Sequence, residues 1–175
     1  AAKPRSKVLI LDANEDVTSK GALFKKVWAE SYKGLVEYRP QHKATSVDAA
    51  TNTVRFEIQD DVRAAVLNVL PPMRAGAIAV QTGLANSNAR WCNVQWLNFE
   101  STAARHIHVI GDSIQIASLM PKSGHMANSQ AKVAAMMIRG ELVSARTFPA
   151  RYTNTCWSLI DTDDCVKVGG AYEPK

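Results

Sequence analysis

The sequence predicts an α/β protein in which short apolar strands alternate with amphipathic helices. The fully apolar run inside Lys7–Asp12 is typical of a parallel strand covered on both faces, and a helical pattern follows it at Thr18–Tyr32. A second strand-to-helix unit is predicted at 106–140, where β-branched residues end in Gly111-Asp112. Hydrophobic residues make up 46% of the 175 residues and charged residues 21%, which is sufficient for a folded core.

The N-terminal strand, Lys7–Asp12, is predicted to be buried and to end in an acid. In dinucleotide-binding folds an acid at a strand end commonly holds a ribose hydroxyl. The Gly-rich loop that should lie about twenty residues upstream of such an acid is absent here. A role for Asp12 as a turn-forming residue is therefore the favoured interpretation, with ribose binding as the alternative.

The first helix is predicted to be capped by Thr18 or Ser19 and to reach about Tyr32, before the stop signal Gly34. Its inner face is expected to carry apolar side chains at helical spacing, and these are interpreted as core rather than as a cofactor site. They are Leu23, Phe24, Val27 and Trp28.

A strand at Leu35–Tyr38 is expected next, followed by a meander that contains Lys43–Asp48 and the strictly alternating Thr53–Ile58. Ala64–Leu70 is predicted to be a further buried strand, closed by Pro71-Pro72. This order describes most of a nucleotide-binding domain without its first strand-helix unit.

In the second half, Arg74–Gly83 is predicted to be a short helix and 106–110 a short buried strand. Ser123 is a suitable N-cap for a helix that includes Ala127–Gly140. A final pair of strands is expected around a turn at 161–164. These strands are Tyr152–Ser158 and Cys165–Ala171.

Composition and motifs exclude several functions. The net charge is +5, but the basic residues are scattered and no aromatic-interleaved basic motif is present, so nucleic acid is not an expected partner. No apolar run approaches 18 residues, so no transmembrane helix is expected. No signal peptide is recognisable, and the polar start looks like a cut through a longer protein.

Neither the cysteines nor the histidines show a metal-like arrangement. The odd number of cysteines argues against a complete disulfide framework. Cys92 beside Trp91 is interpreted as a buried or structural thiol, with an active role as the alternative. The histidines are interpreted as structural or edge residues. They are His106, His108 and His125.

A candidate cofactor site is predicted around residues 111–124. Gly111 lets the backbone pass close to a ligand, and Asp112 follows the predicted strand where open α/β sheets place ligand contacts. The N-terminus of the helix that follows Ser123 offers unpaired N–H groups and a partial positive charge to an electron-rich group.

These residues resemble a known family. The motif Gly111-Asp112, then Met120-Pro121-Lys122-Ser123-Gly124 and Ala127–Ala135, is similar to the second flavin-binding motif of flavoproteins with two dinucleotide-binding domains. More narrowly, it resembles the flavoprotein subunit of flavocytochrome c sulfide dehydrogenase. Asn68–Ala75 and the Tyr-x-Asn-Thr-Cys stretch at Tyr152–Cys156 extend the resemblance.

The resemblance implies a partial flavoprotein with three segments. Residues 1–72 would form an incomplete nicotinamide-type domain with a β-meander, 73–148 the C-terminal part of an FAD domain, and 149–175 the start of a C-terminal interface region. It also implies a catalytic role for Cys156 as one half of a redox-active cysteine pair beside the flavin; a buried strand cysteine is the alternative. Cys165, which no family motif covers, is interpreted as structural.

The same resemblance implies a set of cofactor-binding residues. Asp112 would accept a hydrogen bond from the ribityl chain of FAD, or else serve as a turn acid. Lys122 would stabilise the reduced ring from its pyrimidine side, with a solvated surface lysine as the alternative. The whole implied set is Gly111, Asp112, Met120, Pro121, Lys122, Ser123 and Gly124.

By this resemblance, the intact parent oxidises hydrosulfide at a Cys/FAD centre and passes electrons to a c-type cytochrome in the periplasm. The Gly-x-Gly-x-x-Gly half that anchors pyrophosphate is absent, so this chain alone is expected to bind FAD weakly or not at all and to be inactive. Self-association of exposed apolar surface is also expected. The alternatives are a fragment of a sulfide:quinone or NADH-type reductase and a non-catalytic flavoprotein-like binding module.

Overall fold

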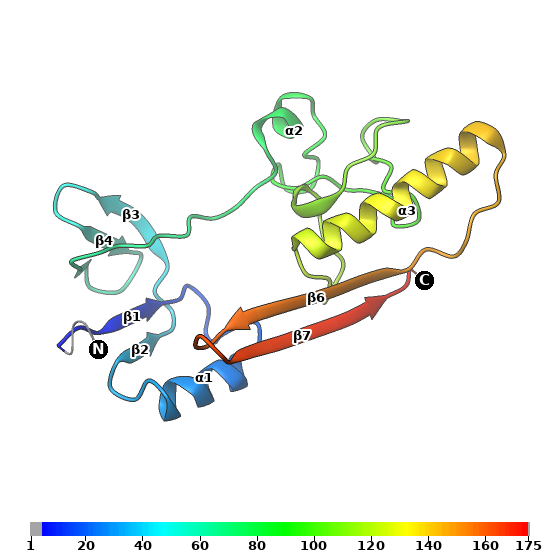
Figure 1. Cartoon of the computed structure of the whole chain (residues 1–175). Coiled ribbons are helices and arrows are strands. Elements are labelled where there is room, and N and C mark those ends of the chain that lie inside the picture. The colour runs from blue at the N-terminus through cyan, green and yellow to red at the C-terminus, as the bar shows by residue number, and fades with distance from the viewer. Residues whose placement is uncertain (1–4, 175) are drawn as a thin grey trace. The chain divides into compact units, whose positions relative to one another are not determined.

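The computed structural model describes residues 5–174 and divides into two compact units (Figure 1). Unit 1 comprises Ala1–Pro71 with Leu159–Val166, and unit 2 comprises Pro72–Ser158 with Lys167–Lys175. The strands form three small sheets of two, three and two strands, interspersed with helices. The predicted mixed α/β class is confirmed. No helix within the described part of the chain is both long and apolar enough to span a bilayer.

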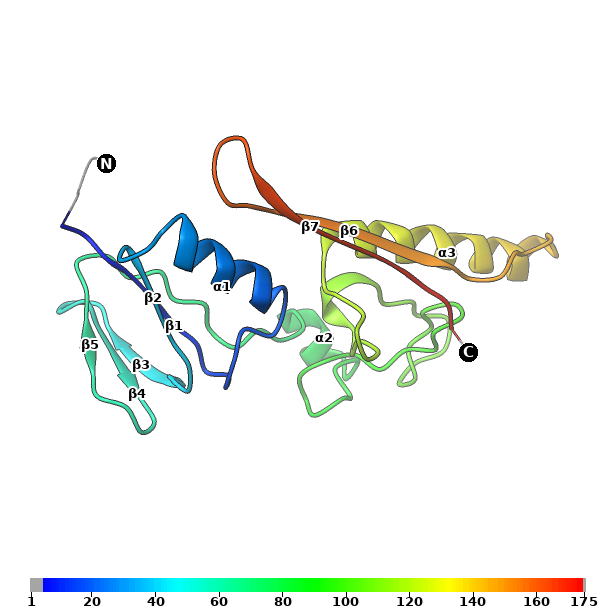
Figure 2. The ribbon, with the colours of Figure 1, turned by 90° about the horizontal axis from the view of Figure 1, so that it is seen from below.

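Unit 1 begins with a parallel strand pair and a helix. β1 (Val8–Leu11) pairs with β2 (Val36–Arg39), with Val8 opposite Val36, and α1 (Gly21–Glu30) connects them (Figure 2). The predicted parallel pairing is correct, but the expected burial of β1 is wrong, because Val8 is 57% exposed. A sheet of only two strands covers too little of each face to bury them.

The start of α1 differs from the prediction. Neither Thr18 nor Ser19 caps the helix, which instead follows Lys20 in the left-handed conformation, at φ 58°. Leu23 is half exposed rather than on the inner face. The inner face is an aromatic stack in which the ring centroid of Trp28 lies 5.9 Å from that of Phe24 and 5.6 Å from that of Tyr38 on β2.

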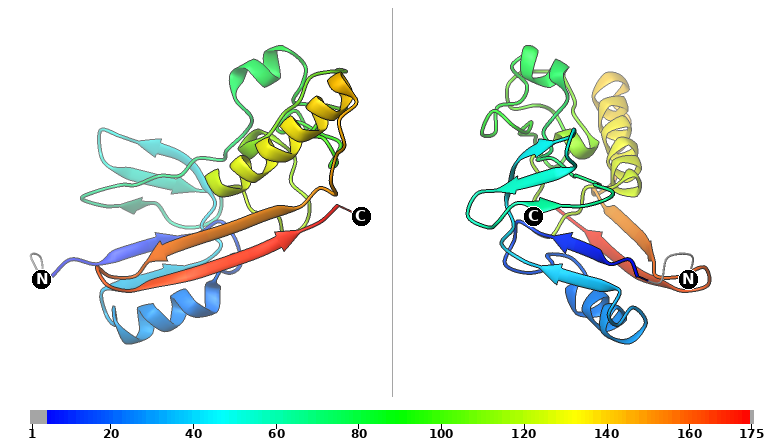
Figure 3. Two further views of the ribbon diagram at one scale, coloured as in Figure 1. Left: turned by 45° about the vertical axis from the view of Figure 1, so that its right-hand side comes forward. Right: turned by 90° about the vertical axis from the view of Figure 1, so that its left-hand side faces the viewer.

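The meander is present as an antiparallel three-stranded sheet (Figure 3). It contains β3 (Ala44–Asp48), β4 (Thr53–Phe56) and β5 (Val62–Arg63).

The predicted buried strand at 64–70 is wrong. No strand forms there, and Val66 and Leu70 are 84% and 88% exposed. The place beside β4 is taken by β5, whose Arg63 lies opposite Thr53, and the chain then leaves the sheet. Pro71-Pro72 has no N–H groups with which to continue a ladder.

Unit 2 is organised around one long helix. α3 (Gly124–Val143) begins as predicted, with the Ser123 hydroxyl accepting a hydrogen bond from Met126 N–H at 3.1 Å. Its buried side chains recur on one face, as an amphipathic helix requires. They are Met126, Gln130, Val133 and Ala134. The shorter α2 (Ala77–Gln81) occupies the middle of the predicted 74–83 helix.

A β-hairpin lies along α3. β6 (Tyr152–Leu159) and β7 (Cys165–Tyr172) pair as expected around the turn near 161–164 (Figures 1 and 2). Thr153 N–H on β6 donates a hydrogen bond to Ser129 Oγ on α3 at 3.0 Å. The core of unit 2 lies where helix, hairpin and loops meet. It contains Val94, Phe99, Ile114, Met120, Met126, Val133, Ala134, Ala150 and Tyr152.

The predicted buried strand at 106–110 is also wrong. This segment makes only an isolated bridge, between Glu100 and His108, and Ile107 is 45% exposed. Apolar β-branched residues favour an extended backbone, but a strand also needs neighbours along its length. Gly111-Asp112 therefore follows an irregular segment and opens a short 3-10 turn, η1 (Gly111–Ser113).

Candidate functional site

The Cys156 thiol is connected to the start of α3 by two hydrogen bonds. Asn154 Nδ2 donates to Cys156 Sγ at 3.2 Å, and Ser123 Oγ donates to Asn154 Oδ1 at 2.5 Å. Tyr152, Asn154 and Cys156 alternate along β6, so they share its inner face. Tyr152 and Asn154 are buried and Cys156 is half-buried. The fold thus brings the predicted thiol to the predicted helix N-terminus.

A second contact ties β6 to the first turn of α3. Thr155 N–H donates to His125 Nδ1 at 3.1 Å. In this arrangement the neutral imidazole of His125 carries its proton on Nε2. The histidine therefore has a structural role in holding the strand that carries Cys156 against the helix.

Lys122 points into the protein rather than away from it. Its ammonium donates to the carbonyl oxygens of Asp112 and Ile114, both at 2.6 Å, and lies 3.7 Å from the centroid of the Trp91 ring. Burial lowers the pKa of Lys122, and the nearby Asp112 carboxylate partly offsets this effect. In the chain as described, the lysine fixes the shape of the 111–114 turn.

The Gly111-Asp112 turn packs directly on α3. Gly111 has φ +70°, a region that favours glycine, and a Cβ built on it would lie 3.3 Å from Ala127 Cβ. Gly111 N–H donates to Gln130 Oε1 at 2.7 Å, and Gln130 Nε2 donates to Met120 Sδ at 3.6 Å. Met120 is therefore a core residue, whereas the side chain of Asp112 is exposed.

The start of α3 is open to a ligand. Within residues 5–174, the N–H groups of Gly124 and His125 make no hydrogen bond, so they remain available to an electron-rich ligand. No atom lies within 4 Å of a Cβ built on Gly124, so this side of the helix start is open. The helix N-terminus can therefore hold an electron-rich ligand edge, and Cys156 lies on the strand next to it.

The remaining cysteines differ in environment from Cys156. Cys92 is completely buried, as expected for a structural thiol, and burial raises its pKa despite the positive charge of Lys122. Cys165 is half-buried on β7 and is also a free thiol.

Asp12 at the end of β1 is engaged within unit 1. Its carboxylate accepts hydrogen bonds from Asn14 N–H at 2.9 Å and from the Tyr38 hydroxyl at 3.0 Å. These bonds, that from Asn14 first, lower the pKa of Asp12. This geometry is that of a turn-forming acid, the favoured interpretation of the sequence.

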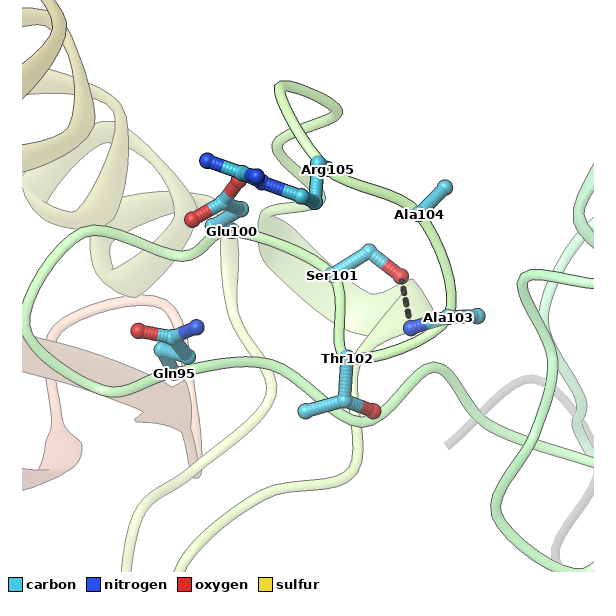
Figure 4. A pocket seen from close by; sticks show the side chains of 7 residues that line it. All are labelled: Gln95, Glu100, Ser101, Thr102, Ala103, Ala104 and Arg105. Atoms are coloured by element: carbon cyan, nitrogen blue, oxygen red, sulfur yellow. Dashed lines mark hydrogen bonds between the residues drawn. The ribbon is translucent and has the colours of Figure 1, made fainter.

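A polar hollow lies between Gln95 and the 100–105 loop (Figure 4). Ser101 Oγ accepts a hydrogen bond from Ala103 N–H there at 3.1 Å, which turns the loop on itself. The hollow contains no cysteine or histidine and none of the predicted site residues. Within the described residues, no three His, Cys, Asp or Glu side chains meet to hold a metal ion.

The sequence interpretation missed two residues of this site. The sequence shows Trp91 only as a neighbour of Cys92, whereas in the structure its ring covers the Lys122 ammonium. The sequence shows Asn154 only as part of a motif, whereas in the structure it links Cys156 to Ser123. The alternation of Tyr152, Asn154 and Cys156 along one strand was the available signal for Asn154.

Comparison with known families assigns both ends of the chain to one flavoprotein. Residues 1–71 match the family model for the central part of the sulfide dehydrogenase [flavocytochrome c] flavoprotein chain. Residues 148–175, which include Cys156, match the flavin-binding model of flavocytochrome c sulphide dehydrogenase. Both models describe a flavoprotein, a class whose cofactor is a flavin. The chain belongs to the family of flavocytochrome c sulfide dehydrogenase flavoprotein chains.

A solved structure shares the fold. A chain in the cryo-EM structure of the Tetrahymena thermophila mitochondrial ATP synthase, an F1Fo composite tetramer, superimposes with a TM-score of 0.73 at 18% sequence identity. The match covers 97% of the present chain and 42% of that chain, so the present chain spans about two-fifths of that protein's length.

Proposed function

We propose that this chain is part of a flavin-dependent sulfide dehydrogenase in which Cys156 reacts with hydrosulfide beside the flavin. The observation that carries the proposal is the connection of Cys156, through Asn154, to Ser123 at the start of α3. This connection lies partly within the segment that matches the flavin-binding model. Residues 1–72 would belong to an incomplete nicotinamide-type domain, and 73–148 to the C-terminal part of an FAD domain.

The chemistry expected of the chain's own residues centres on one sulfur atom. The Cys156 thiolate forms a sulfur–sulfur bond with hydrosulfide and becomes a persulfide. Hydrosulfide releases its proton in this step, and the two sulfur atoms together lose two electrons. A bound flavin supplies the two-electron acceptor for this oxidation. The free N–H groups of Gly124 and His125 and the positive end of α3 stabilise negative charge at the neighbouring ligand edge.

We also propose the partner and the compartment by relation to the family. A c-type cytochrome would receive the electrons, as the name of the flavocytochrome family implies, and the parent would work in the periplasm. FAD would be the flavin of the parent, whereas the present chain alone would bind it weakly or not at all. An absorption spectrum of the purified chain with stoichiometric bound flavin would contradict this last expectation.

The decisive experiment uses the protein from the full reading frame that contains this sequence. Anaerobic addition of hydrosulfide is expected to bleach the visible flavin absorption, and added cytochrome c is expected to become reduced. Cys156→Ser should retain the flavin but lose the bleaching, whereas Cys165→Ser should bleach normally. Bleaching by Cys156→Ser at the rate of the unsubstituted protein would remove Cys156 from the reaction.

One observation favours a second candidate, a non-catalytic structural module. The structural relative with a TM-score of 0.73 is a chain of a mitochondrial ATP synthase tetramer. A protein with the same fold can therefore be a component of a large assembly. This candidate predicts that the protein from the full reading frame contains no flavin and does not respond to hydrosulfide.

Self-association is a further part of the proposal. Val66 and Leu70 in unit 1 are each more than 80% exposed, and Met73 and Ile78 in unit 2 are each more than 60% exposed. Large apolar side chains exposed to this extent favour association with another surface. Size-exclusion chromatography with light scattering should show dimers or larger species, and a monomer across the micromolar range would contradict this.

A further inference from the structure

Asn154 is nearly inaccessible, at 3% exposure, and both ends of its side-chain amide are engaged. Oδ1 accepts the Ser123 hydroxyl proton at 2.5 Å, and Nδ2 donates to Cys156 Sγ at 3.2 Å. The same Oδ1 lies 3.6 Å from Cys156 Sγ. The amide therefore lies between the N-cap residue of α3 and the sulfur.

The two ends of the amide are shared between the helix cap and the sulfur. Ser123 Oγ accepts from Met126 N–H at 3.1 Å, because a backbone N–H can only donate. A serine hydroxyl can accept and donate at the same time, and the proton of Ser123 is donated to the amide oxygen of Asn154. The amide nitrogen is thereby directed to Cys156.

We propose that Asn154 is the positioning residue of the Cys156 sulfur, with an amide oriented by Ser123 that stabilises the thiolate and holds it beside the start of α3. The Asn154 amide nitrogen lies 3.2 Å from Cys156 Sγ and donates to it. When the sulfur is protonated, its S–H can instead donate to Oδ1 at 3.6 Å. One amide thus serves both protonation states without moving, and the proton released goes to solvent.

The proposal deepens the proposed function, since it concerns the same sulfur, but its test does not depend on flavin or hydrosulfide. The nucleophile in thiol chemistry is the thiolate, so alkylation by iodoacetamide reports the thiolate fraction at a given pH. Peptide mapping by mass spectrometry follows Cys156 separately from Cys165 and Cys92 in the same sample. Cys165 then serves as an internal control in every variant.

Four variants of the full chain test the assignment. Asn154→Leu removes both amide contacts, and Asn154→Asp keeps an acceptor for Ser123 while it replaces the donor that faces the sulfur. Each should slow the alkylation of Cys156 at pH 7 by about tenfold and move its pH profile to higher pH. Ser123→Ala should slow it less, by about threefold, because the amide remains but loses its orientation. Thr153→Val, a change on the exposed face of β6, should have no effect.

A purely structural role for Asn154 would loosen β6 but would not displace the pH profile. Circular dichroism identifies any variant that has lost the fold. If Asn154→Leu is unfolded, the proposal is tested with Asn154→Asp and Ser123→Ala alone. A folded Asn154→Asp variant with the pH profile of the unsubstituted chain would overturn the proposal. If Cys156→Ser nevertheless loses flavin bleaching, the proposed function stands and only the positioning role is rejected. If instead Asn154→Asp shifts the pH profile but Cys156→Ser still bleaches the flavin normally, the proposed function is rejected and the positioning role stands.

Discussion

The Lys122 ammonium lies 3.7 Å from the centroid of the Trp91 ring. Its other contacts are the carbonyl oxygens of Asp112 and Ile114, each at 2.6 Å. A lysine held by two carbonyls and an aromatic ring fixes local structure by direct contact. The 111–114 turn, which the family resemblance places beside the flavin, is thus held in shape by the same lysine that the resemblance assigns to the cofactor.

Replacement of this lysine should destabilise unit 2. Lys122→Met keeps the length of the side chain but removes the charge and the donors, so we expect a loss of about 1–3 kcal/mol in the free energy of unfolding. Urea unfolding followed by tryptophan fluorescence measures this loss. Lys132→Met, at an exposed position of α3, is the matched control and should change stability by less than about 0.5 kcal/mol. Equal effects of the two substitutions would contradict a structural role for Lys122.

The stability of unit 2 should fall in strong alkali because of Tyr152. Burial raises the pKa of Tyr152 from 10.0 to about 12, and its hydroxyl donates a hydrogen bond to the Trp96 carbonyl oxygen. Between these two values the unfolded chain loses the phenol proton while the folded chain keeps it. The raised pKa of Tyr152 therefore contributes about 2 kcal/mol to the free energy of unfolding. This contribution is fully present below pH 10 and is lost as the pH rises to about 12.

Urea unfolding at a series of pH values from 9 to 12 tests this expectation. Tyr152→Phe should be less stable at neutral pH, because the Trp96 carbonyl loses its donor, but its stability should decline less in alkali. The pKa of Tyr38 in unit 1 is also raised to about 12, by burial first and by the Asp12 hydrogen bond second. The comparison is therefore best made in a Tyr38→Phe background. Identical alkaline slopes with and without Tyr152 would refute the assignment.

The cysteines should react with an alkylating reagent in an order set by burial. Cys92 is fully buried and its pKa is raised, so it should be alkylated at least about tenfold more slowly than Cys156 or Cys165 in the folded chain. In 6 M guanidinium chloride the rates should converge, because the burial is lost. Quenched-flow alkylation with peptide mapping measures all the rates together. Rapid labelling of Cys92 in the folded chain would show that its surroundings open easily.

Two glycine substitutions separate backbone strain from close packing. Gly111→Ala places a methyl group 3.3 Å from Ala127 Cβ at a φ of +70°, so it should cost about 1–3 kcal/mol. Gly83→Ala has a similar φ of +75° but open space around it, so it should cost only about 1 kcal/mol of strain. Urea unfolding of the two variants gives the difference, which reports the contact between the 111 turn and α3. Equal losses of stability in the two variants would mean that the structure accommodates the added methyl group at residue 111 with no loss of stability beyond the backbone strain.

The local signals in the sequence determined much of the fold. A serine N-cap before a run of helix formers predicted the start of α3, and strict alternation predicted the strand of the meander that became β4. The turn at 161–164 predicted the final hairpin. These elements form through contacts between residues that are close in the sequence, either within one helix or across a short turn. The sequence pattern of each segment is therefore sufficient to predict it. Cys92, next to Trp91, is buried as predicted, because a free cysteine behaves as a small apolar residue.

Strands at 64–70 and 106–110 were predicted from apolar composition alone, and neither forms. A strand exists only if another strand offers it hydrogen bonds, and the partner is a property of the tertiary structure. The same reason explains why β1 is half exposed although its residues are apolar.

For the candidate site, the sequence determined the residue types and their spacing: a cysteine on a strand, a capped helix and a glycine turn. Only the tertiary structure decided that Asn154 joins the thiol to the helix cap and that Lys122 points inward to Trp91. Side-chain partners thirty residues apart are selected by how helix and hairpin pack, because packing fixes distances that no local pattern encodes.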